Sequence, residues 1–250
     1  MTLTVPCLFG LESLVADEMR RLDLKNVRAE NGRVHCEGTL ADIARLNINL
    51  RCGARVLMEL GSFPACDFEA LFQGVYALPW ENYIPRDGEF PVKGYSLNSQ
   101  LHSVPACQSI VKKASAKRLG EKYGVETLPE SGSRYQIQFS IIKDVATLYL
   151  DTSGEGLYKR GYRAKNMGAP LRETLAAALV TLSRYRGKDP FCDPFCGSGT
   201  IPIEAALIAK NRAPGLDRSF AAQKWKNMDS KLWLEAGDEA MDKEFHGHYD

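Results

Sequence analysis

The segment "FCDPFCGSGTIPIEAA", residues 191–206, decides the architecture of the second half of the chain. An apolar, strand-like run ends at Asp193, the chain passes through glycines at 197 and 199, and apolar residues then recur at helical spacing. We interpret 188–200 as a strand with its glycine turn, followed by a helix with Pro202 in its first turn. Strand, turn and helix together predict the start of a doubly wound α/β domain, whose ligands sit at the strand C-termini.

The glycine turn differs from the common phosphate-binding loops. A Walker loop and a dinucleotide fingerprint would both need a glycine where Pro202 stands. Without Cβ atoms at 197 and 199, a phosphate-free ligand could lie against the backbone and the first N–H groups of the helix. The carboxylate of Asp193 would favour a cationic ligand, and S-adenosylmethionine has these properties. A bare GxG pattern would fit a simple tight connection equally well.

The front half is predicted to contain two smaller units. Residues 1–63 read as strand, helix, a hairpin turned at Asn31-Gly32, helix and strand, which is the ferredoxin-like order. Residues 64–155 read as helix, strand, a long helix capped by Ser103 with Pro105 in its first turn, and a closing hairpin turned near Lys143-Asp144.

A linker rich in glycine and basic residues follows at 154–170, and we place a domain boundary near residue 156. Pro170 is expected to open a helix that Gly187 ends. Its buried stripe is predicted to comprise Leu171, Leu175, Ala178, Leu179 and Leu182. The three expected domains are therefore 1–63, 64–155 and 156–250.

Three stretches carry a resemblance to a known family. "DPFCGSGT" closely resembles motif I of class I S-adenosylmethionine-dependent methyltransferases. "GYSLNSQLHSVPACQSIVKKASAKRL" (94–119) resembles the core of a THUMP domain, and "LYKRGYRAKNMGAPLRETLAAAL" (157–179) the entry to the catalytic domain. Together they resemble the THUMP-domain RNA methyltransferases, and among these the bacterial RlmL-like enzymes that methylate guanine N2 in 23S ribosomal RNA. The resemblance implies S-adenosylmethionine as cofactor and a THUMP half that binds RNA.

The resemblance assigns cofactor contacts by position. It implies that the residues around the cofactor are Asp193, Phe195, Cys196, Gly197, Ser198, Gly199 and Thr200, together with Pro170 and Leu171. An acidic end of a second strand and an Asn/Asp-Pro-Pro-Tyr stretch belong to the family pattern, but neither occurs here. We therefore expect a truncated chain with an incomplete pocket, no catalytic residue of its own and little activity.

Basic residues without nearby acids suggest where RNA binds. Segments 93–122 and 156–172 are strongly basic although the whole chain has a net charge of only +1. Basic side chains interleaved with tyrosines suit a phosphate backbone and unstacked bases. A solvated helix face would explain the lysines of 112–117 equally well. The predicted RNA contacts are Lys93, Ser99, His102, Lys112, Lys113, Lys117, Arg160 and Arg163, with Lys159 and Lys165 nearby.

Other features limit the alternatives. No targeting segment or membrane span is evident, and seven scattered cysteines fit reduced thiols, so we predict a cytoplasmic monomer without a metal site. Three functions stay open: an rRNA guanine-N2 methyltransferase, a free-standing RNA-binding module, and a methyltransferase for tRNA or DNA adenine. The THUMP-like half argues against DNA as a partner.

Overall fold

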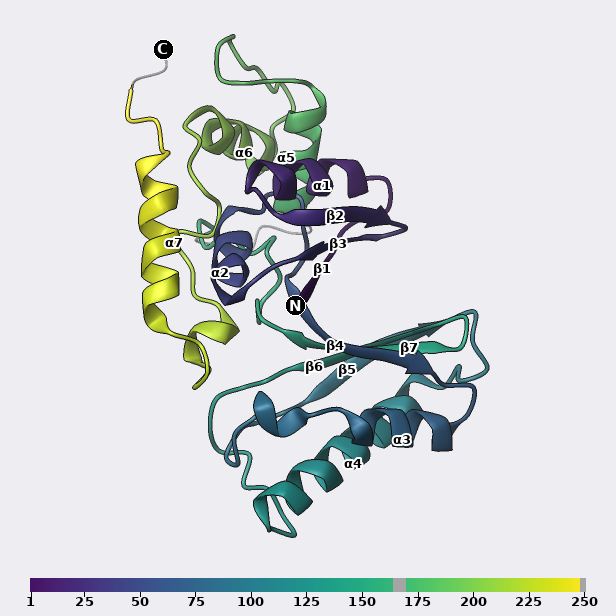
Figure 1. The fold of residues 1–250 in the computed structure, drawn as a ribbon. Coiled ribbons are helices and arrows are strands. Elements are labelled where there is room, and N and C mark those ends of the chain that lie inside the picture. Colours follow the sequence, from purple (N-terminus) through teal and green to yellow (C-terminus); the bar gives the residue numbers. More distant parts are fainter. Residues whose placement is uncertain (164–169, 248–250) are drawn as a thin grey trace.

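The structure, a computed structural model, describes residues 1–163 and 170–247. Seven strands form one sheet in the spatial order β2-β3-β1-β4-β7-β6-β5 (Figure 1). Neighbouring strands are antiparallel except β5 and β6, which run parallel. The strands are β1 (Thr2–Pro6), β2 (Lys25–Glu30), β3 (Arg33–Glu37), β4 (Leu57–Pro64), β5 (Val92–Leu97), β6 (Ile137–Ile142) and β7 (Val145–Asp151).

The described residues also form seven α-helices. They are α1 (Glu12–Arg21), α2 (Leu40–Asn49), α3 (Phe68–Ala77), α4 (Val104–Tyr123), α5 (Glu173–Leu182), α6 (Thr200–Ala209) and α7 (Ser230–Asp242), and the short 3-10 turns are η1 (Trp80–Asn82) and η2 (Ala221–Lys224). No helix in the described ranges is both long and apolar enough to cross a membrane.

The ferredoxin-like order of the first 63 residues is confirmed. The elements follow as β1-α1-β2-β3-α2-β4, and the β2–β3 hairpin turns where Gly32 takes a φ of 74°. Thr39 caps α2 because its hydroxyl accepts the backbone N–H of Asp42, whose carboxylate accepts the N–H of Thr39 in return. In β3, Val34 and Cys36 are buried on either side of the partly exposed His35, whereas Leu3, Thr4 and Val5 of β1 are all buried. Helical periodicity, strand alternation and turn chemistry therefore agree in this unit.

Strand β4 joins the first unit to the second. It pairs with β1 only at Leu57 and Met58, but it pairs with β7 along its whole length. Helices α3 and α4 cover one face of the β4-β7-β6-β5 part (Figure 1). Ser103 stands at the N-cap of α4 as expected, but its side chain makes no capping hydrogen bond. The two units thus share one continuous sheet.

The C-terminal segment departs from the prediction in three ways. Helix α5 begins at Glu173, and Arg172 is its N-cap. Pro170 and Leu171 therefore precede the helix instead of opening it. The helix ends at Leu182, five residues before Gly187. Its buried face consists of small and polar residues, including Ala176, Ala177 and Val180, whereas Leu179 and Leu182 are 44% and 59% exposed. The expected stripe is therefore confirmed only in part: Ala178 is buried and Leu175 packs against the core, but Leu179 and Leu182 do not belong to the buried face.

The strand expected at 188–193 is also absent from the described part of the chain. These residues form bends and extended chain without a ladder partner. A β-strand requires a neighbour for its backbone hydrogen bonds, and no strand of the seven-stranded sheet lies beside this segment. The glycine turn and helix α6 follow as predicted, with Pro202 in the first turn of the helix.

Helix α7 returns to the N-terminal unit and packs along α2 (Figure 1). Arg45 of α2 pairs with Glu239 of α7 at 3.0 Å. The rings of Phe220 and Trp233 stack with centroids 5.2 Å apart. The last described segment is therefore anchored on the ferredoxin-like unit.

A buried ion pair fixes α6 to the N-terminal unit. Arg160 is 3% exposed and Glu204 of α6 is fully buried, and their side chains meet at 3.3 Å. The Arg160 guanidinium also donates to the carbonyl oxygens of Leu157 and Arg51, at 2.7 and 2.6 Å. Tyr162 donates its hydroxyl to Glu204 at 3.1 Å. The segment expected to be a linker therefore contains the principal connection between the two halves.

We predict that Glu204→Gln destabilises the protein by about 3–5 kcal/mol, because it leaves the buried charge of Arg160 without its counter-ion. Urea unfolding at neutral pH measures the change. Glu235→Gln is the control, since that residue sits on α7 with its side chain 63% exposed and a partner 3.9 Å away. The double variant Arg160→Met, Glu204→Met is expected to recover much of the loss. A loss below about 1 kcal/mol would contradict the assigned importance of this pair.

Candidate cofactor loop and RNA-binding surface

The glycine loop, residues 193–200, leads directly into the N-terminus of α6. Gly197 and Gly199 have φ angles of 52° and 75°, in the left-handed region where a Cβ atom costs about 1–2 kcal/mol. The loop is closed by a hydrogen bond from the Gly199 N–H to the Cys196 carbonyl at 2.8 Å. The backbone N–H of Phe195 donates to Asp193 Oδ1 at 3.1 Å. Both glycines are therefore required by the course of the backbone itself.

The space beside both glycines is open. A Cβ atom added to Gly197 would have only the Phe195 carbonyl oxygen near it, at 4.0 Å, and one added to Gly199 only Ile203 Cδ1, at 3.8 Å. Gly199 is the N-cap of α6 and offers no side chain to the first N–H groups of the helix. A ligand can therefore reach this backbone, which fits the expected cofactor contact.

Arg163 holds the glycine loop against the preceding segment. Its guanidinium forms an ion pair with Glu173 of α5 and donates to the Leu171 carbonyl at 3.1 Å. It also donates to the Thr200 hydroxyl at 2.7 Å and lies 3.4 Å from Ser198 Oγ. Three predicted cofactor residues, Leu171, Ser198 and Thr200, thus meet at one side chain.

The remaining predicted cofactor residues lie near this cluster with differing exposure. Leu171 is half-buried, whereas Pro170 and Cys196 are exposed. Phe195 is 93% exposed, so its ring contacts little of the described protein. Ser198 and Thr200 are linked through their hydroxyls at 3.1 Å. The structure brings Leu171, Ser198 and Thr200 together, while Phe195 extends outward.

The lysines of α4 divide into bound and free side chains. Lys112 pairs with Glu130 at 2.6 Å and lies 3.3 Å from the centroid of the Phe90 ring, so it contributes to local structure. Lys113 is exposed and has no ion-pair or hydrogen-bond partner among the described residues. Lys117 is exposed beside Glu121, at 3.9 Å. Of these three, Lys113 is the most available to a ligand.

The predicted RNA contacts that precede α4 also divide into residues with and without polar partners. Lys93 of β5 is exposed, and it too lacks a polar partner within the described ranges. Ser99 serves the local turn, because its hydroxyl donates to the Leu97 carbonyl and accepts the Asp144 N–H. His102 is exposed with Nδ1 2.9 Å from the Gln100 carbonyl oxygen. Lys93 and His102 therefore remain candidate RNA contacts.

The described basic residues of the expected linker each pair with a carboxylate. Arg160 is buried in its ion pair, and Arg163 is committed to Glu173 and the glycine loop. The expectation that Arg160 binds RNA does not fit its burial, and Arg163 is better described as a positioning residue. Lys159 is exposed but pairs with Glu155 at 2.7 Å. Lys165 lies outside the described residues.

Sequence reasoning missed a contact across the open face of the sheet. Arg33, at the start of β3, donates to the hydroxyl of Tyr95 at 3.0 Å and to that of Tyr149 at 3.3 Å. Burial raises the pKa of Tyr149. Tyr95 is 43% exposed and shares its strand face with Lys93. The ring of Tyr95 and the cations of Arg33 and Lys93 therefore lie on one surface. The alternation along β5 could have indicated that Lys93 and Tyr95 share a face.

Family profiles match three consecutive segments of the chain. Residues 2–57 match the RlmL ferredoxin-like domain, 65–151 the THUMP domain, and 160–245 the RMKL-like methyltransferase domain. The chain therefore contains an RlmL ferredoxin-like domain, a THUMP domain and an RMKL-like methyltransferase domain, in this order. Within the described part, no group of three or more His, Cys, Asp or Glu side chains could hold a metal ion.

Two curated relatives illustrate the similarity. YpsC of Bacillus subtilis, a candidate RNA methyltransferase by name, is 45% identical over 244 residues, which are 97% of this chain and 63% of YpsC. The ribosomal RNA large subunit methyltransferase K/L of Psychromonas ingrahamii is 36% identical over 92% of this chain and 31% of its own length. This chain therefore spans less than two thirds of either relative.

Solved structures with the same fold carry differing descriptions. A protein of Listeria monocytogenes described as a predicted N6-adenine-specific DNA methylase matches with a TM-score of 0.93 and 48% identity, over 97% of this chain and 64% of that one. SMU.472, a candidate methyltransferase complexed with SAH, matches with a TM-score of 0.92 and 43% identity, over 98% of this chain and 65% of that one. The names agree on methyl transfer and differ on the nucleic acid.

We predict that Arg163→Lys loosens the glycine loop, because a lysine cannot hold Glu173, Leu171 and Thr200 at once. Hydrogen exchange followed by mass spectrometry is expected to show faster exchange in peptides covering 193–203, with the sheet peptides unchanged. The control is Arg172→Lys, since Arg172 is exposed and faces the Tyr158 ring instead of the loop. Equal exchange in both variants would contradict the positioning role.

Proposed function

We propose that this chain is the RNA-binding and cofactor-binding part of an enzyme that methylates the N2 amine of a guanine in 23S ribosomal RNA, using S-adenosylmethionine. The single observation that carries the proposal is the glycine loop. It presents open backbone at Gly197 and Gly199 and is held next to a ferredoxin-like and THUMP platform. The complex of SMU.472 with SAH and the name of the Psychromonas relative support the cofactor and the rRNA substrate.

The chain's own residues would contribute binding and orientation. Bound S-adenosylmethionine would supply an electrophilic methyl group. Gly197 and Gly199 would let the ligand lie against the backbone, and the N-terminal N–H groups of α6 would donate hydrogen bonds to its polar atoms. The carboxylate of Asp193 would attract its positive charges. Arg163 would keep the loop in this shape through Thr200 and Glu173. We propose that Cys196 and Ser198, on either side of Gly197, also contact the bound cofactor.

Orientation of the target amine would require further protein. N-methylation needs the nitrogen lone pair aimed at the methyl carbon, which is largely a matter of positioning. The Asn/Asp-Pro-Pro-Tyr stretch implied by the family resemblance does not occur in these 250 residues. We therefore expect the chain alone to bind RNA and to transfer methyl groups weakly or not at all.

The DNA methylase description of the Listeria structure supports one alternative, a DNA adenine methyltransferase. The match of 65–151 to the THUMP domain favours RNA over DNA, because we expect that half to bind RNA. Transfer of tritiated methyl groups by the full gene product to unmodified 23S rRNA, to tRNA and to duplex DNA separates the candidates. Incorporation into guanine N2 of 23S rRNA is the expected result, and incorporation into DNA adenine would reject the proposal.

We predict that Gly199→Val in the full gene product weakens S-adenosylmethionine binding at least tenfold, which corresponds to about 1.4 kcal/mol. A β-branched side chain at a φ of 75° is strained and fills the open space beside the backbone. Isothermal calorimetry measures the affinity. Gly237→Val is the matched control, because a Cβ atom at Gly237 of α7 meets nothing within 4 Å. No binding by the unmodified protein would remove the enzyme proposal.

We predict that Lys93→Gln combined with Lys113→Gln weakens RNA binding, because each lysine is exposed and free to meet a phosphate. The slope of log affinity against log salt is expected to decrease by about 0.7 per lost contact for single-stranded RNA. Fluorescence anisotropy with a labelled 23S rRNA fragment measures both quantities. The control is Lys231→Gln on α7, a 75% exposed side chain away from the THUMP unit. Equal effects of the variant and the control would contradict an RNA surface on this unit.

A further inference from the structure

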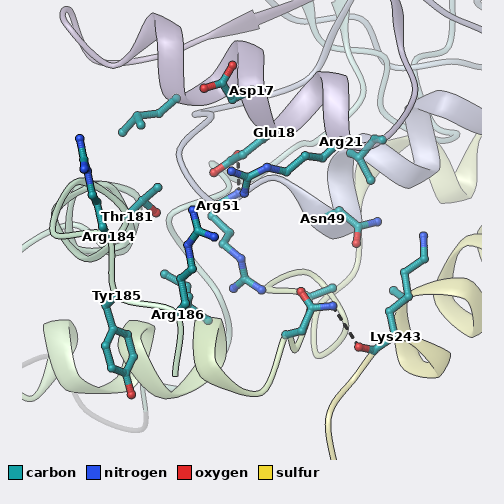
Figure 2. A pocket seen from close by; sticks show the side chains of 16 residues that line it. Asp17, Glu18, Arg21, Asn49, Arg51, Thr181, Arg184, Tyr185, Arg186 and Lys243 are labelled. Atoms are coloured by element: carbon teal, nitrogen blue, oxygen red, sulfur yellow. Dashed lines mark hydrogen bonds between the residues drawn. The ribbon is translucent and has the colours of Figure 1, made fainter. Parts of the chain in front are cut away.

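A cavity of about 710 Å³ lies between the N-terminal unit and the C-terminal helices (Figure 2). Its walls come from α1, the ends of α2 and α5, the C-terminal end of α6, and α7. None of residues 193–200 lines it, so it is separate from the glycine loop. Sites for small molecules usually measure about 300–1,000 Å³, so the space is large enough for a nucleotide.

Four arginines that form no salt bridge within the described residues line this cavity. They are Arg21 of α1, Arg51 after α2, and Arg184 and Arg186 after α5. Within the described part of the chain, no carboxylate lies within 4.0 Å of any of their guanidinium groups. Figure 2 shows the side chains of Arg21, Arg51 and Arg186 reaching into the same space from three elements.

Arg51 provides an independent sign that an acceptor is missing. Its Nη2 donates to the carbonyl oxygens of Arg212 at 2.8 Å and Leu207 at 3.5 Å. Its Nη1 is buried and has no hydrogen-bond partner. Burial lowers the pKa of this arginine. A buried, unpaired donor on a charged group is costly, so an anion in the cavity would stabilise this arrangement.

The two acids of the cavity offset these cations only in part, because Glu18 attracts Arg51 without forming a salt bridge with its guanidinium. Asp17 pairs with Arg20 at 2.8 Å, on the exposed side of α1. Glu18 accepts the backbone N–H groups of Arg51 and Cys52, at 2.9 and 3.2 Å, and burial raises its pKa. Lys243 also lines the cavity and pairs with Glu239 at 2.6 Å. The walls thus carry five cationic and two acidic side chains.

We propose that this cavity binds a nucleotide unit of the RNA substrate through its phosphodiester group. Guanidinium groups match phosphate oxygens in bidentate geometry and are the common protein partner of that group. Apolar residues such as Leu14, Ile208 and Ala240 line the rest of the space and suit a sugar or base. The proposal rests on the proposed function, because it names where part of the same RNA binds.

The test removes the two exposed arginines and leaves the fold-supporting Arg51 intact. In the double variant Arg184→Gln, Arg186→Gln, we expect the affinity for a fluorescein-labelled 23S rRNA fragment to fall about tenfold in low salt. The slope of log affinity against log salt is expected to decrease by about 0.7–1.4, the value for one or two phosphates. The matched control is Lys188→Gln with Lys231→Gln, two exposed lysines that do not line the cavity. The control is expected to change affinity less than threefold.

Three results would overturn the proposal, and they are distinguishable. If Lys93→Gln with Lys113→Gln weakens RNA binding but the arginine variant does not, the cavity assignment fails and the proposed function stands. If inorganic pyrophosphate raises the melting temperature, and the arginine variant abolishes this shift while binding RNA normally, the cavity holds a small anion instead. If the unmodified protein binds no RNA, the proposed function fails together with this inference.

Discussion

The ion pair between Arg160 and Glu204 is the interaction on which the arrangement of the two halves depends. Two charges removed from water are stable only when nearly every donor and acceptor has a partner. Here three backbone carbonyls, one carboxylate and the Tyr162 hydroxyl complete the network. The carbonyls belong to the chain around Leu50, Arg51 and Leu157, and the carboxylate belongs to α6. The helix that begins at the glycine loop is therefore attached to the ferredoxin-like unit by a contact that tolerates little displacement.

Three residues further along the chain, Arg163 makes the equivalent connection to the loop itself. It joins Glu173, Leu171 and Thr200, so the two arginines secure α6 at its N-terminus and at its inner face. The β4 strand meanwhile makes the ferredoxin-like and THUMP units one continuous sheet. A nucleic acid bound to the THUMP unit and a cofactor bound at the glycine loop would thus be attached to the same continuous structure. This geometry gives a physical basis for delivery of one to the other.

Much of the front half could be predicted from the sequence because its signals are local. Val34 and Cys36 alternate with exposed or partly exposed residues, Asn31-Gly32 favours the hairpin turn, and Gly197 and Gly199 mark the loop by their conformational freedom. The failures involve distant partners. A basic residue in a glycine-rich segment looks exposed until Glu204, 44 positions away, is brought beside Arg160. The run at 188–193 has strand composition, but no strand in the described ranges offers it a ladder. Apolar spacing likewise marked Leu179 and Leu182 as buried without knowing which surface would cover them.

The arginines of this chain fall into two physical classes, and the difference bears on function. Those that join elements, such as Arg45, Arg118 and Arg163, each have a carboxylate close by. Those that line the cavity form no salt bridge within the described residues, although Glu18 attracts Arg51 from beyond 4.0 Å, and the cluster keeps a net positive charge. Such clustering of positive charge lowers the stability of the fold unless an anion binds. Water screens the charges only where the cavity is open. A phosphate group would neutralise the cluster and fill the vacant donor of Arg51 at the same time, which no side chain of the described protein does.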